Sequence, residues 1–114
     1  MEPLSLNKLA DDLLTRAREE NSGRGAHNLL VGRQHPLSQT VIVLTAGHEL
    51  AEHDSPGEAT LYVLGGRVRF SAGADSCELS TGDFLPIPRE RHSVAAAEDS
   101  VLILTVVKDS RPAQ

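Results

Sequence analysis

Residues 47–66 read GHELAEHDSPGEATLYVLGG, and a second stretch, residues 82–94, reads GDFLPIPRERHSV. In the first stretch, residues 49–53 and 60–64 are predicted β-strands, the latter because threonine, tyrosine and valine favour extended backbone. In the second, residues 83–87 form a predicted strand, and a further strand over residues 93–97 begins at its end. The pair Gly65-Gly66 suits a two-residue hairpin whose turn needs positive φ angles. Both stretches therefore predict short strands joined by tight turns.

The chain keeps this strand-like character from residue 26 onward. Turn residues such as Gly73 and Gly82 separate short segments at close, even spacing. The other predicted strands are residues 26–31, 39–45, 67–71, 76–79 and 101–107. Many short strands without intervening helices favour a sandwich or a barrel over alternating βαβ units.

The N-terminal segment has a different period. Ser5 is a candidate N-cap, and the glycines of residues 21–25 suit the end of a helix. Apolar residues recur between these points at helical spacing, at Leu6, Leu9, Ala10, Leu13, Leu14 and Ala17. The predicted organisation is an all-β, single-domain chain preceded by one amphipathic helix. The helix and its linker occupy residues 1–25, the barrel residues 26–109 and a C-terminal tail residues 110–114.

Two of the predicted strands are apolar on both faces. Residues 41–44 read VIVL and residues 101–107 read VLILTVV. Successive side chains of a strand point to opposite faces of its sheet, so both faces of these strands need cover. The inner face fills the core. We expect the outer face to be covered by the N-terminal helix, by a second copy of the chain, or by both, and a homodimer is the predicted assembly.

Composition narrows the classes of function. A formal net charge of −5 without a basic run argues against a nucleic-acid surface. Cys77 is the single cysteine, so no intrachain disulfide is possible. The first residues lack the basic and apolar segments of a signal peptide, and no apolar run is long enough to span a bilayer. A cytoplasmic protein without a membrane partner is the prediction.

Taken in order, the two stretches resemble the two motifs of the cupin superfamily. The first runs from Gly47 to the strand that ends at Gly65-Gly66, and the second runs from Gly82 through a proline to His92. With the flanking strands, the resemblance covers roughly residues 26–107. It implies a small, stand-alone cupin with a jelly-roll β-barrel.

The resemblance also points to positions that hold a metal in many cupins, namely two histidines and a glutamate in the first motif and one histidine in the second. His53 matches the first histidine, and His92 matches the histidine of the second motif. The second histidine position is Ser55, and the glutamate position is Ala59, with Glu58 displaced by one residue. Half of the usual ligand set is therefore replaced by residues that bind transition metals poorly or not at all.

These observations leave three functions open. In the leading hypothesis, the barrel binds a small molecule, with His53 and His92 at the polar end of a mainly aliphatic pocket. The ligand-binding candidates in this hypothesis are His53, Ser55, Ala59, Leu61 and His92.

In the second hypothesis, the chain is a metal-dependent enzyme resembling a dioxygenase or an isomerase. His53 and His92 would then hold Fe, Mn, Ni or Zn with help from Glu58, His27 or His35. In the third, the barrel is a regulatory or interaction module with a degenerate pocket. Fold alone does not choose among them.

Overall fold

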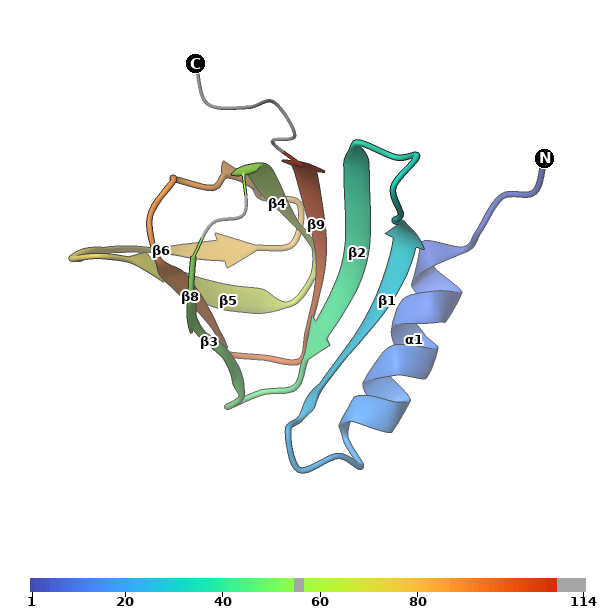
Figure 1. Ribbon diagram of the computed structural model, residues 1–114. Helices are drawn as coiled ribbons and strands as arrows, with labels where there is room; N and C mark the ends of the chain where they lie inside the picture. Colours follow the sequence, from blue (N-terminus) through green and yellow to red (C-terminus); the bar gives the residue numbers. More distant parts are fainter. Residues whose placement is uncertain (55–56, 109–114) are drawn as a thin grey trace, which may run out of the picture.

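The computed structural model describes residues 1–54 and 57–108 of the chain. Two antiparallel β-sheets face each other in a jelly-roll arrangement (Figure 1). The five-stranded sheet has the order β1 (Arg24–Leu30), β2 (Leu37–Leu44), β9 (Ser100–Lys108), β4 (Gly57–Gly65) and β7 (Phe84–Pro86). The four-stranded sheet has the order β3 (Glu49–His53), β8 (His92–Ala96), β5 (Arg67–Ala72) and β6 (Asp75–Ser80). The predicted fold class is confirmed: one helix precedes an all-β fold, and each predicted strand is present within a few residues of its expected bounds.

Helix α1 (Leu6–Ala17) begins and ends where the apolar spacing predicts. The side chain of Ser5 caps it by accepting a hydrogen bond from the backbone N–H of Lys8 at 3.2 Å. Its apolar face packs on the outer face of β1 and β2, where Val41 and Val43 are completely buried. In Figure 1 the helix lies along these two strands at one side of the molecule. Within the described residues, no helix is long and apolar enough to cross a membrane.

The end of α1 is tied to the barrel through Asp99. Its carboxylate accepts hydrogen bonds from the backbone N–H of Ala46 at 2.9 Å and from Nε of Arg18 at 3.0 Å. The hydrogen bond from Ala46, together with the nearby guanidinium of Arg18, lowers the pKa of Asp99 below its usual value. The charged carboxylate thus links the helix to two loops of the barrel.

The connection at Gly65-Gly66 differs from the sequence prediction. A hairpin was expected there, but β4 and β5 belong to different sheets, so the hairpin prediction is wrong. Gly66, with a φ of 92°, instead marks a corner at which the chain crosses from one sheet to the other. The same holds for the turn at Gly82, between β6 and β7. Only the β1–β2 and β5–β6 connections join neighbouring strands of one sheet.

The space between the sheets is filled mainly by aliphatic side chains. Leu102, Val63 and Val68 have no exposed surface, and Phe70 is the aromatic residue of this core. The remaining buried members of the cluster are Leu44, Ala59, Leu61, Ala72, Leu79, Ile87, Val94, Ala96 and Val106. Because packing fills most of the interior, we expect a binding site where this core meets the surface.

Candidate functional site

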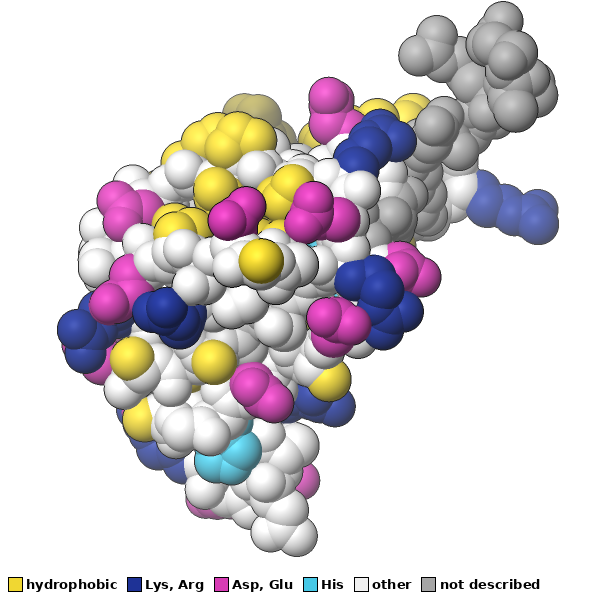
Figure 2. Space-filling model, turned by 90° about the vertical axis from the view of Figure 1, so that its left-hand side faces the viewer, with side chains coloured by type: hydrophobic (Ala, Val, Ile, Leu, Met, Phe, Trp, Pro, Cys, Tyr) yellow, Lys and Arg dark blue, Asp and Glu magenta, His cyan; other side chains and the backbone are white. Residues whose placement is uncertain are grey.

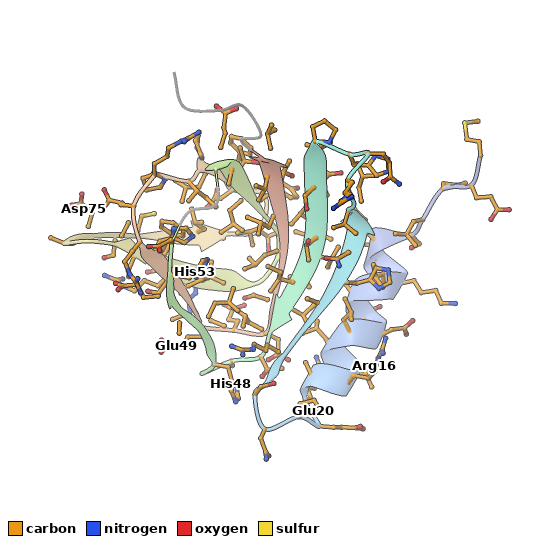
Figure 3. The ribbon with its side chains drawn as sticks, in the orientation of Figure 1. Arg16, Glu20, His48, Glu49, His53 and Asp75 are labelled. Carbon is orange, nitrogen blue, oxygen red and sulfur yellow. The ribbon has the colours of Figure 1, made fainter. Side chains whose placement is uncertain are left out.

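The pairing of β3 with β8 brings His53 and His92 together. The two residues are direct partners across the strands, and their ring centroids lie 4.4 Å apart in an edge-to-face arrangement. His92 is buried, with 4 % of its surface exposed, whereas His53 is exposed. One imidazole thus faces the core, and the other lies over it at the surface; Figure 3 labels His53 on β3.

Backbone carbonyls fix the orientation of both rings. Nδ1 of His53 lies 2.9 Å from the carbonyl oxygen of Ala51, and Nδ1 of His92 lies 3.0 Å from that of Glu90. A carbonyl oxygen only accepts hydrogen bonds, so each Nδ1 carries the proton and donates it. In the neutral ring, Nε2 of each histidine is therefore left with a free lone pair.

Nε2 of His92 keeps some contact with solvent although the residue as a whole is only 4 % exposed. This atom has no hydrogen-bond partner among the described residues. Yet none of the fully buried side-chain nitrogen or oxygen atoms in that part of the chain lacks a partner. Nε2 therefore has contact with solvent, and it is a hydrogen-bond acceptor available to a ligand.

A small hollow lies next to His92, although neither histidine is among its lining residues. Its volume is about 190 Å³, and its lining residues are Phe70, Ala72, Asp75, Ser76, Cys77, Leu85, Pro88 and Glu90. Three of these residues contact His92 or pair with it across the strands. The ring of Phe70 stacks on its imidazole with centroids 5.2 Å apart, Ala72 is its partner across the strands, and Glu90 accepts the Nδ1 hydrogen bond.

The charged residues on the lining of the hollow are both acidic. Asp75 and Glu90 lie on its lining, and neither forms an ion pair among the described side chains. Asp75 starts β6 at the tip of the β5–β6 hairpin, on the opposite side of the molecule from α1 (Figure 3). The nearby guanidinium of Arg91 is already engaged by Glu52 and Asp54. The charged side chains that line the hollow are therefore both acidic, which disfavours anionic ligands, while the cation of Arg69 reaches the lining only through its hydrogen bond to Ser76.

Of the other ligand-binding candidates, two are buried in the core and one lies outside the described residues. Ala59 and Leu61 are 5 % and 3 % exposed and belong to the same buried cluster as Phe70. Ser55 lies outside the described residues, as does the tail predicted for residues 110–114. Glu58 is exposed and, one residue from buried Ala59, points to the opposite face of β4.

Neither of the two candidate auxiliary histidines lies near His53. His27 pairs with Val41, whose side chain packs against α1, so His27 lies on the outer face of the five-stranded sheet. His35 lies in the connection between β1 and β2. Neither position belongs to the sheet that carries the histidine pair.

The donors present do not fit a transition-metal site. Among the described residues, no three histidine, cysteine, aspartate or glutamate side chains come together in a way that could hold a metal ion. Two imidazoles alone leave a coordination shell short of the three or four protein ligands typical of zinc or iron sites.

Elemental analysis tests this interpretation directly. We expect protein purified without chelators, then incubated with Fe, Mn, Ni and Zn and desalted, to retain less than about 0.1 equivalent of any metal, because two neutral nitrogens bind weakly. Plasma mass spectrometry provides the measurement. About one equivalent per chain, lost in both His53→Gln and His92→Gln, would contradict the prediction.

The sequence prediction missed the hollow itself. Phe70, Cys77 and Leu85 had no assigned role in it, yet they form much of its wall. Their placement depends on the pairing of β5 with β6, where Phe70 is the partner of Cys77. The alternation of Val68, Phe70 and Ala72 toward the interior predicts one wall of the hollow. The local sequence does not indicate which strands lie beside that wall.

Comparisons with known proteins agree with this fold. The family model described as a cupin domain matches residues 33–108. No match is found among curated proteins. A conserved Streptococcus pyogenes protein of unknown function is 28 % identical, with a TM-score of 0.71 over 81 % of this chain and 80 % of that chain. A cupin superfamily protein from Desulfitobacterium hafniense is 17 % identical, with a TM-score of 0.73 over 95 % of this chain and 92 % of its own.

A mutant salicylate 1,2-dioxygenase from Pseudoaminobacter salicylatoxidans has a similar domain. It is 20 % identical, with a TM-score of 0.76 over 88 % of this chain. The match covers 33 % of the dioxygenase chain, so the present chain corresponds to about one third of that enzyme. At this level of identity the likeness concerns the fold alone.

Proposed function

The chain belongs to the cupin domain family, and from this premise we propose that it binds a small, neutral, hydroxyl-bearing molecule beside His53 and His92. The observation that supports the proposal is Nε2 of His92, an acceptor without a partner among the described residues, in a ring that contacts Phe70 and Glu90 on the lining of a mainly apolar hollow. An apolar wall with a few convergent polar groups is the usual composition of a ligand site.

Size limits the ligand to about one ring. The hollow has a volume of about 190 Å³, and a buried apolar cavity of about 150 Å³ accommodates benzene. Phe70 and Leu85 offer contact surface for such a ring. Phenol fits both the volume and the polarity of the site, because its ring meets apolar side chains and its hydroxyl donates to a neutral imidazole.

Charge separates phenols from aromatic acids. Asp75 and Glu90 lie on the lining without a cationic partner among the described side chains, so a carboxylate would be repelled. Salicylate, which gives the structurally similar dioxygenase its name, carries such a carboxylate. We therefore expect phenol to bind more tightly than benzoate or salicylate, by about tenfold or more for one close charge.

Cys77 provides a built-in reporter for occupancy. It is the single cysteine of the chain, it is exposed, and it lines the hollow. We expect phenol to slow the alkylation of Cys77 by N-ethylmaleimide, with half-protection at about 1 mM for a ligand of this size. Intact-protein mass spectrometry measures the rate, and benzoate and salicylate are compared at the same concentrations.

Histidine variants tie this protection to the proposed site. We expect it to be lost in the double variant His53→Gln with His92→Gln and retained in the matched control His27→Gln, which alters a histidine on the distant face. The exposed His53→Gln alone provides a second comparison if the double variant fails to fold. Protection that survives both histidine changes would contradict the proposal. No protection by any of the three probes would favour an interaction module.

A further inference from the structure

Four strands form the edges of the two sheets, namely β1, β7, β3 and β6, and β1 differs from the other three. β7 has three residues and ends at Pro86, whereas β3 and β6 each carry two acidic residues. Figure 2 looks onto the side where β6 lies and shows acidic and basic groups interspersed there. Short length, proline and charge protect a sheet edge from pairing with other chains. β1 has seven residues, no proline and one permanently charged side chain, Arg24 at its start, so most of its edge lacks this protection.

The backbone groups of β1 point alternately toward β2 and toward the open edge. The backbone N–H of Thr45 donates to the carbonyl oxygen of Gly23 at 2.8 Å. In an antiparallel pair, residues that exchange hydrogen bonds alternate with residues that do not, so the register assigns Gly25 and His27 to hydrogen bonds with β2. The residues between them direct their N–H and C=O groups outward, where no described residue partners them: Arg24, Ala26 and Asn28.

A hollow lies on each side of this edge. The inner hollow, of about 290 Å³, is lined by Ala26 of β1, Ile42 of β2 and Leu50 of β3. The outer hollow, of about 320 Å³, lies between β1 and the end of α1, where Leu13 and Ala17 line it. In Figure 1, β1 is the last strand of its sheet and lies beside α1. Four residues line both hollows: Ser22, Arg24, Gly25 and Ala26.

The two hollows differ in chemistry. The inner hollow is mainly apolar. The outer hollow has two guanidinium groups, those of Arg16 and Arg24, and one carboxylate, that of Glu20. None of these three groups forms an ion pair with a described side chain. Because successive side chains of a strand point to opposite faces, a strand added to β1 would place alternate side chains in an apolar hollow and in a cationic one.

We propose that β1 binds an extended, acidic segment of another protein as an additional strand of the five-stranded sheet. Hydrogen bonds to the outward backbone groups of Arg24, Ala26 and Asn28 hold the segment in place whatever its sequence. An apolar side chain of the segment enters the inner hollow. A carboxylate on the next residue enters the outer hollow and pairs with Arg16 and Arg24.

Charge favours an acidic partner over a second copy of this chain. β1 is the strand that a second copy would offer for edge-to-edge pairing, and it contains no carboxylate to meet Arg16 and Arg24. The chain carries a net charge of −5, so an acidic segment is repelled over most of the surface and attracted at this edge. No residue of the two hollows lines the hollow beside His92, so this inference is independent of the proposed ligand.

Fluorescence anisotropy of a labelled peptide tests the added strand. The probe is the capped heptapeptide Ser-Val-Glu-Val-Glu-Val-Ser, whose valines and glutamates lie on opposite faces when it is extended. We expect it to bind the full chain with a dissociation constant of about 100 µM, because ordering a short peptide is costly. The same peptide with lysine in place of both glutamates should bind about tenfold more weakly or worse. N-methylation of the Glu-Val-Glu amides keeps both charges but removes backbone donors, and it should weaken binding to a similar extent.

Variants of the chain locate the binding edge. Ala26→Pro removes an outward N–H and leaves the hydrogen bonds between β1 and β2 intact, and proline is tolerated at such edge positions. We expect this variant to lose peptide binding and to keep its circular dichroism spectrum. The double variant Arg16→Gln with Arg24→Gln should bind about tenfold more weakly. Arg33→Gln is the matched control, because Arg33 is exposed in the connection between β1 and β2 and lines neither hollow.

The possible results separate this partner from the others. Equal affinity for the glutamate and lysine peptides, or no binding of the glutamate peptide at about 1 mM, would overturn the proposal. Binding that survives Ala26→Pro would also overturn it. If that variant is unfolded, the N-methylated peptide decides the same point on the wild type, where undiminished binding excludes an added strand. Self-association of the wild-type chain that Ala26→Pro abolishes would overturn the proposal in favour of a second copy at this edge.

Discussion

Gly66→Ala lowers the free energy of unfolding by about 4 kcal/mol, as the sum of backbone strain and a steric overlap. Gly66 has a φ of 92°, which side chains of L-residues rarely adopt. A Cβ at this position would overlap the carbonyl oxygen of Asp99 and Oγ of Ser100, and would lie 2.7 Å from Cα of Ser100. These atoms belong to the connection from β8 to β9, which also crosses from one sheet to the other. The substitution therefore forces two crossing connections apart.

Hydrogen bonds and burial hold Ser100, at the start of β9, in place. Ser100 is fully buried, and its Oγ accepts a hydrogen bond from the backbone N–H of Arg67 at 3.0 Å. The same hydroxyl donates to the carbonyl oxygen of Glu98 at 2.8 Å. Movement of Ser100 away from a new methyl group would break these contacts, and the polar groups would then be buried without partners.

Substitutions at two other glycines distinguish the cost of backbone strain from the cost of steric overlap. Gly82 has a φ of 91° but open space where its Cβ would lie, and Gly65 has open space without a positive φ. In chemical denaturation we expect losses of about 1–2 kcal/mol for Gly82→Ala and below about 0.5 kcal/mol for Gly65→Ala. Equal losses for Gly66→Ala and Gly82→Ala would show that the overlap with Asp99 and Ser100 is relieved at little cost.

The sequence was sufficient for the strands but not for their connections. The alternation of Val68, Phe70 and Ala72 with polar residues identifies β5 and its buried face, because side chains alternate along a strand. A glycine pair indicates a sharp change of direction, but turn chemistry is local and does not say which sheet the next strand joins. The expected hairpin at Gly65-Gly66 is therefore a corner.

The site was predictable in the same partial way. The two motifs indicate His53 and His92, and the register of β3 with β8 makes them partners. The hollow beside them depends on long-range pairings, since Phe70 meets Cys77 across one strand boundary and Val94 across the other. Pairings of this kind depend on how the whole sheet packs, which one sequence does not specify locally.

The second large effect is expected for Phe70→Ala, which should lower the stability of the protein and increase the size of the ligand that it accepts. Phe70 is 3 % exposed in the core, and its ring also stacks on His92. Removing a buried phenylalanine ring costs about 4 kcal/mol, through lost transfer free energy and the cavity left behind. Since Phe70 lines the hollow, that cavity merges with the ligand site rather than forming a closed void.

The enlarged hollow should accept a larger ring. We expect 2-naphthol to protect Cys77 of the Phe70→Ala variant from alkylation but not Cys77 of the wild type, where the volume of about 190 Å³ suits a single ring. Phe70→Leu, which loses about 1–2 kcal/mol, is the milder variant if the alanine form is unstable.

Val68→Ala is the matched control for this change in ligand size. Val68 lies on the same inner face of β5 and is fully buried, but it does not line the hollow. We expect the substitution to lower stability by about 2 kcal/mol and to leave the choice between phenol and 2-naphthol unchanged. Gain of naphthol protection in Val68→Ala as well would mean that core loosening, rather than the wall formed by Phe70, sets the size of the ligand. Naphthol protection confined to the Phe70 variants would identify that ring as the residue that limits ligand size.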